Sequence, residues 1–91
     1  MDRNIIAAGD KATAETAKET LWLGGNAYDA AVAAVFTSMT VEPSLTGPGG
    51  GGHFMAYPAD GQAVLFDFFV DMPSGVIEPN QMEFFDIEVD F

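Results

Sequence analysis

The stretch AAVAAVF at residues 30–36 contains no polar side chain over almost two helical turns. Asn26 lies shortly before it and Asp29 follows Asn26 by three residues, an arrangement similar to a helix capping box. We therefore predict a helix from Asn26 to about Met39. A helix that is apolar on every side has no face for water and belongs in the interior of a large protein.

The chain is too short to bury this helix fully. Ninety-one residues form one small domain at most, and few segments remain to cover the helix. We expect an isolated chain to expose an apolar patch large enough to associate. With 48% apolar and 19% charged residues, the composition is still that of a globular core rather than a disordered chain. Residues 1–91 are therefore expected to form a partial domain with more protein around it.

Two elements are predicted before the apolar helix. Residues 4–8 (NIIAA) have the composition of a short strand. Asp10 can cap a helix over residues 11–23, because its carboxylate can accept hydrogen bonds from the free amides of the first turn. Gly24 and Gly25 end this helix, since glycine adopts the left-handed C-terminal conformation most easily.

Strands are predicted after the apolar helix. Residues 53–57 and 63–69 indicate a β-hairpin, with a turn over residues 58–62 that contains an Asp-Gly pair. Residues 85–91 alternate strictly between apolar and acidic side chains, which is typical of a strand. This alternation stops without a turn residue, and an open strand edge is an aggregation hazard. We therefore expect the natural chain to continue past Phe91.

The charge is unevenly distributed along the chain. All three basic residues, Arg3, Lys11 and Lys18, lie in the first eighteen positions, whereas eleven acidic residues and no basic residue follow from Glu19 onward, and the net charge is -11. Such a field repels nucleic acid and anionic membrane surfaces, so neither is expected as a partner. No stretch approaches the length of a membrane span, and the first ten residues lack the apolar run of a signal peptide. A cytoplasmic location is favoured if Met1 is the natural start.

The glycine-rich stretch SLTGPGGGGHFM, residues 44–55, has the G-x-G-x-x-G spacing of a nucleotide-binding loop at Gly47, Gly49 and Gly52. A dinucleotide site needs a strand before the glycines and a helix after them, but here the predicted order is helix, loop, strand. A phosphate loop needs Lys followed by Ser or Thr, where this chain has His53 and Phe54. The glycines are therefore predicted to form a structural turn or a close backbone contact.

Metal and cofactor sites are not expected. The chain has no cysteine, and His53 is its only histidine, without a second ligand type at metal spacing. A structural role with hydrogen bonds is more consistent with the position of His53. Asp86, Glu88 and Asp90 share one face of the predicted tail strand, which favours a solvated or partner-covered face over a cation site. The serine and threonine hydroxyls lie in no activating context.

Several motifs follow one another in a fixed order through residues 19–57. They are GGNA at 24–27, DAAVAA at 29–34, VEP at 41–43, the glycines through 52, and Phe54-Met55. This order resembles the N-terminal part of the large subunit of the gamma-glutamyltranspeptidase family, and the resemblance extends over about residues 5–73. It implies an α+β fold, the N-terminal-nucleophile hydrolase αββα sandwich, of which this chain is an N-terminal fragment with two helices followed by antiparallel strands.

The resemblance also implies an activity. Enzymes of this family are made as precursors that cut themselves, which frees a threonine at the start of a small subunit. The threonine attacks a gamma-glutamyl amide such as that of glutathione, its own amine can serve as the base, and the acyl group passes to water or an amino acid. No segment of this chain resembles the threonine-bearing subunit. The chain alone is therefore expected to be inactive, with no catalytic residue of its own, and to need the remainder of the large subunit and the small subunit as partners.

One position departs from the family pattern. The family has a D-F-R-E segment after the hairpin, whose arginine is similar to a residue that pairs with the glutamyl α-carboxylate, and this chain has Phe69 in its place. Phe69 is thus the candidate substrate-binding residue, and it offers a carboxylate no partner. Either a cation outside the chain binds the carboxylate, or the substrate is an acyl group of the kind handled by cephalosporin-acylase-like relatives. The alternatives are that Phe69 is only core, and that the chain is a non-catalytic piece that folds with a partner or by self-association.

Overall fold

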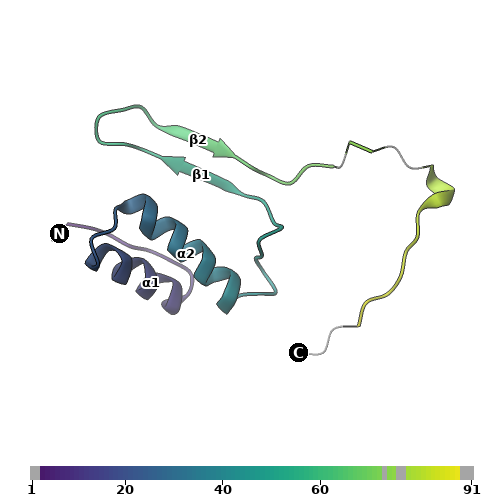
Figure 1. Ribbon diagram of the computed structural model, residues 1–91, viewed down its shortest axis with the longest axis horizontal. Helices are drawn as coiled ribbons and strands as arrows, with labels where there is room; N and C mark the ends of the chain where they lie inside the picture. Colours follow the sequence, from purple (N-terminus) through teal and green to yellow (C-terminus); the bar gives the residue numbers. More distant parts are fainter. Residues whose placement is uncertain (1–2, 73, 76–77, 89–91) are drawn as a thin grey trace.

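The computed structural model describes residues 3–72, 74–75 and 78–88. Two helices come first, and an antiparallel hairpin follows (Figure 1). The helix α2 lies between α1 and the hairpin, and the C-terminal segment runs away from all of them. The elements are α1 (Lys11–Trp22), α2 (Ala27–Val41), β1 (His53–Ala56), β2 (Val64–Asp67) and a short 3-10 turn, η1 (Pro79–Gln81).

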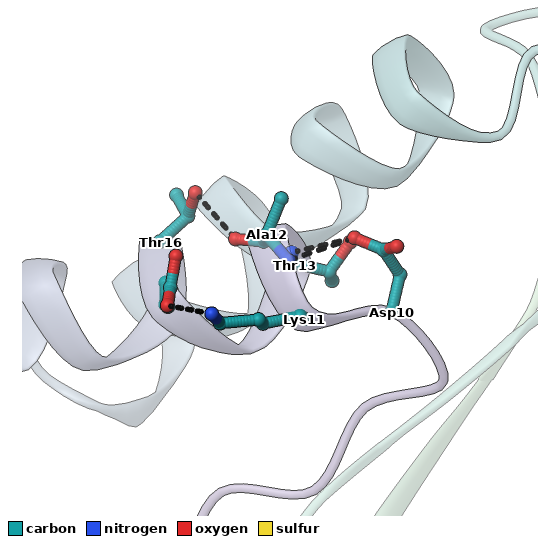
Figure 2. A network of polar contacts seen from close by, with 6 residues as sticks. Asp10, Lys11, Ala12, Thr13 and Thr16 are labelled. Atoms are coloured by element: carbon teal, nitrogen blue, oxygen red, sulfur yellow. Dashed lines mark hydrogen bonds and ion pairs between the residues drawn. The ribbon is translucent and has the colours of Figure 1, made fainter.

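The helix α1 begins at the predicted cap. Asp10 Oδ1 accepts hydrogen bonds from the amides of Ala12 and Thr13, at 2.8 and 3.3 Å (Figure 2). These bonds satisfy two of the amides that a helix leaves free at its first turn. After the helix ends at Trp22, Gly24 takes a φ of 96°, the left-handed region that glycine enters without steric cost. The predicted start and end of this helix are confirmed.

The helix α2 has the predicted capping box. Asn26 Oδ1 accepts from the amides of Tyr28 and Asp29, at 2.9 and 3.0 Å, and Asp29 Oδ2 accepts in return from the amide of Asn26 at 2.9 Å. Gly25, just before the box, leaves no room for a side chain, because a Cβ there would lie 2.9 Å from the carbonyl oxygen of Thr20. The capping box therefore fixes the start of α2, and the missing side chain at Gly25 allows its close approach to the end of α1.

The helices α1 and α2 pack through small side chains. Thr13 and Ala17 of α1 and Ala30 of α2 are buried there. The opposite side of α2 is open, and Phe36 is 64% exposed. The described residues therefore cover the apolar helix mainly on one side, and its exposed side chains are consistent with the predicted apolar patch.

The hairpin has the predicted antiparallel arrangement. His53 is the partner of Asp67, and Ala56 is the partner of Val64 at the other end of the strands. Past β1 and β2 the ladder continues by one pair, since the amide of Phe68 donates to the carbonyl of Gly52 and the amide of Gly52 donates to the carbonyl of Phe68. The strands are shorter than the predicted ranges, but their pairing is as expected.

Two predicted strands are wrong within the described residues. Residues 4–8 form no strand and instead line a shallow cavity with α1 and α2, and residues 82–88 form none either. A strand needs a neighbour to satisfy its amides and carbonyls, and the sheet of the described part has only β1 and β2. Asp86 and Glu88 therefore do not share a strand face. The rest of the predicted tail strand, residues 89–91, lies outside the described residues.

The chain is more extended than a closed domain of its size. Its radius of gyration is 18.0 Å, whereas a compact domain of this length has about 12 Å. None of the helices in the described ranges is long and apolar enough to cross a membrane.

Candidate functional site

The hairpin presents two different faces, because side chains alternate along a strand. One face carries His53, Asp67 and Phe69, and we refer to these residues as the His53 face. The other face lies toward α2 and is entirely apolar; we call it the groove face, and it consists of Phe54, Ala56, Val64, Phe66 and Phe68.

On the His53 face, a single carboxylate oxygen joins three residues. Nε2 of His53 lies 3.2 Å from Oδ1 of Asp67, and the amide of Phe69 donates to the same oxygen at 3.1 Å. The imidazole of His53 stacks on the ring of Phe69, with 5.9 Å between ring centroids and 20° between planes. His53 thus has a polar contact with Asp67, and its predicted hydrogen-bonding role stays a prediction. Residue order alone did not identify Asp67, although its position opposite His53 follows from the hairpin register.

Phe69 does not lie in the core of the described chain. Phe69 is 67% exposed, and its ring stacks on the imidazole of His53. The residue singled out from the sequence is therefore available on the surface that this chain presents.

The glycine run lies directly against this segment. A Cβ on Gly51 would lie 2.5 Å from the amide nitrogen of Val70 and 2.7 Å from the carbonyl oxygen of Phe68, distances that no real side chain allows. Before it, the amide of Gly50 donates to the carbonyl of Gly47 and closes a turn. The predicted role of the glycines, a turn with close backbone packing, is confirmed, and the structure brings them together with residues 68–70.

An open apolar groove of about 660 Å³ lies between the groove face and α2. The ring of Tyr28 reaches Phe54 with 6.3 Å between centroids, and Phe54 reaches Phe66 with 6.1 Å. Among the lining side chains only that of Tyr28 carries a polar atom, so the groove offers packing and little chemistry. Its lining is Tyr28, Ala31, Val32, Val35, Phe36, Phe54, Ala56, Pro58, Val64, Phe66 and Phe68.

The described residues contain neither a metal cluster nor an activated hydroxyl on the helices. Nowhere in the described ranges do three or more His, Cys, Asp or Glu side chains gather as metal ligands would. The hydroxyl of Thr13 in α1 is buried and has no hydrogen-bond partner among the described residues. Other helical hydroxyls donate to carbonyls of their own helix, for example Thr16 to Ala12 at 3.0 Å and Thr37 to Ala33 at 2.9 Å. Such bonds are typical of structural hydroxyls in helices.

Comparison with known proteins identifies the family. A sequence model described as Gamma-glutamyltranspeptidase matches residues 13–81. The chain belongs to the gamma-glutamyltranspeptidase family. The match includes most of α1, all of α2, the glycine run, the hairpin and the two faces described above.

Curated relatives agree with this membership. The chain is 41% identical over 68 residues to the glutathione hydrolase proenzyme of Pseudomonas aeruginosa. The aligned region covers 75% of this chain and 12% of the relative. It is 42% identical over 53 residues to the glutathione hydrolase proenzyme of Bacillus subtilis, and this aligned region covers 58% of this chain and 9% of the relative. The chain thus spans about an eighth or less of the length of these family members.

A solved structure of the family shares the fold. The gamma-glutamyltranspeptidase of Pseudomonas nitroreducens, solved in complex with L-DON, superimposes with a TM-score of 0.75 at 37% identity, over 86% of this chain and 23% of that chain. The fold class predicted from the sequence is confirmed: the two helices and the antiparallel hairpin belong to an N-terminal-nucleophile hydrolase fold.

Proposed function

We propose that this chain forms the N-terminal segment of the large subunit of a gamma-glutamyltransferase-like enzyme. In this enzyme a threonine outside these 91 residues attacks a gamma-glutamyl amide of the glutathione class and transfers the acyl group to water or to an amino acid. The observation that carries the proposal is the family match over residues 13–81, together with relatives named as glutathione hydrolase proenzymes.

In this proposal the chain supplies structure and one wall of the acyl site, while the nucleophile comes from elsewhere. The apolar groove between α2 and the hairpin is the surface on which the remainder of the large subunit packs. An open groove lined by apolar side chains favours such a cover, because exposed apolar patches favour association with other protein. The 91-residue chain by itself is inactive.

Phe69 forms part of the acyl site in this proposal, at the position of the carboxylate-binding arginine of the family. An aromatic ring cannot form the charge-assisted hydrogen bonds that an arginine forms with a carboxylate, each worth about 1.5 to 3 kcal/mol. The enzyme therefore turns over gamma-glutamyl amides weakly.

The experiment starts from the gene. The reading frame past Phe91 is sequenced, the whole product is expressed, and its cleavage is followed by gel electrophoresis and by mass spectrometry of the new N-terminus. We expect a small subunit that begins with threonine and release of nitroaniline from acyl p-nitroanilides, both lost when that threonine is replaced by alanine. A reading frame without a processing threonine would falsify the proposed activity.

The exposed groove also favours a second candidate, a non-catalytic chain that folds with a partner or by self-association. Sedimentation of the isolated 91-residue chain tests it. Association that weakens when Phe36, which lines the groove, is changed to lysine would support this candidate. A well-behaved folded monomer would contradict it.

A further inference from the structure

We propose that the stacked rings of His53 and Phe69 form a binding surface for a flat, apolar acyl group that carries no carboxylate, and that Asp67 is the residue that positions this surface. The inference rests on the proposed function, because it names the acyl group that the same site receives. It concerns three side chains on the His53 face, of which the family resemblance had pointed only to position 69.

Asp67 holds both rings at once. Its Oδ1 lies 3.2 Å from Nε2 of His53 and accepts the amide hydrogen of Phe69 at 3.1 Å. One contact orients the imidazole and the other fixes the backbone that carries the phenyl ring. The two rings then meet with 5.9 Å between centroids, within the range of attractive aromatic pairs.

The glycine run also holds the backbone around Phe69 in place. The amide and carbonyl of Phe68 pair with Gly52, and the absence of a side chain on Gly51 lets the chain at residues 68–70 pack against it. A surface held in this way loses little conformational entropy when a ligand stacks on it.

The charges around this surface disfavour a carboxylate. A substrate carboxylate beside Phe69 would meet the carboxylate of Asp67, and the imidazole of His53 already faces that carboxylate. No lysine or arginine follows Lys18 in the chain. Like charges repel, whereas a flat apolar group gains a third aromatic layer without such a cost. An uncharged acyl group fits these conditions, with its ring at the fourth carbon, where the gamma-glutamyl group of the proposed function carries its α-carboxylate.

Binding to the processed enzyme tests the inference without need of turnover. Calorimetry compares 4-phenylbutanamide with L-glutamine, which is the gamma-glutamyl amide of the same chain length with an α-amine and α-carboxylate in place of the ring. We expect 4-phenylbutanamide to bind about tenfold more tightly. Phe69→Arg should reverse this order, with a gain of about ten- to hundredfold for L-glutamine. Phe68→Leu, in the neighbouring residue on the groove face, should leave the order unchanged.

Variants of Asp67 separate positioning from general structure. Asp67→Asn keeps an oxygen that can accept from the amide of Phe69, whereas Asp67→Ala removes it. We expect Asp67→Ala to raise the KM for 4-phenylbutanoyl p-nitroanilide about two- to tenfold, with kcat nearly unchanged. The KM of Asp67→Asn should stay close to that of the unchanged enzyme. Equal losses of kcat in both variants would contradict a positioning role.

The outcomes distinguish this inference from the proposed function. Preference for 4-phenylbutanamide without cleavage of any anilide supports the inference and contradicts the proposed activity. Cleavage of anilides together with equal or tighter binding of L-glutamine overturns the inference and leaves the proposed activity standing. Binding of neither amide overturns the inference.

Discussion

The two faces of the hairpin share one backbone but differ in what orders them. On the groove face, the ring of Phe54 contacts the rings of Tyr28 and Phe66, and the groove stays open to solvent. On the His53 face, the carboxylate of Asp67 fixes its neighbours through polar contacts. The described residues leave the first face open, and the second is ordered by its own residues. Strand alternation thus separates, within a few residues, an open apolar surface from the surface that we propose for recognition.

The largest effect is expected on the groove face. Phe66→Ala should destabilise the processed enzyme by about 3 to 5 kcal/mol, the usual cost of emptying the site of a buried phenylalanine. In the isolated chain Phe66 is 53% exposed, so the same change should cost much less there. Urea unfolding of both forms measures the difference. Equal small losses in the two forms would show that the groove is never covered.

A smaller loss is expected where the glycine run meets the hairpin. Gly51→Ala forces a Cβ into backbone atoms of residues 68–70, and overpacking of this kind costs about 1 to 3 kcal/mol. Gly49→Ala is the matched control, because a Cβ at Gly49 meets nothing within 4 Å. Thermal unfolding of the two variants should differ clearly. Identical melting temperatures would contradict the close contact at Gly51.

The smallest effect on stability is expected on the His53 face. The side chains of His53 and Asp67 are 53% and 65% exposed, and exposed pairs contribute about 0 to 1 kcal/mol. His53→Gln should therefore leave the unfolding midpoint almost unchanged while it weakens binding of 4-phenylbutanamide about two- to tenfold. A large loss of stability with unchanged binding would show that His53 serves packing rather than binding, and would contradict the different roles of the two faces.

Local features were predictable from the sequence. The caps at Asp10 and Asn26 and the glycine after α1 depend on neighbouring residues alone, and all were expected. The close contact at Gly51 was expected as well, because four adjacent glycines cost stability unless the backbone needs them.

Features that depend on distant partners were not predictable in the same way. The alternation in residues 85–88 is typical of a strand, but a strand forms only beside another, and the described part provides no neighbour for it. The cluster at His53 likewise required the register that places it opposite Asp67. The role of Phe69 in substrate binding stays a prediction.

The short connection at residues 23–26 between α1 and α2 has a consequence for biosynthesis. Contacts between helices so close in sequence are local, and local helical structure forms within microseconds to milliseconds. A ribosome adds only about 5 to 20 residues per second. If the remainder of the large subunit follows, as we propose, the helix pair waits for seconds with its apolar side uncovered. Such an interval is long enough for a chaperone to bind the nascent chain.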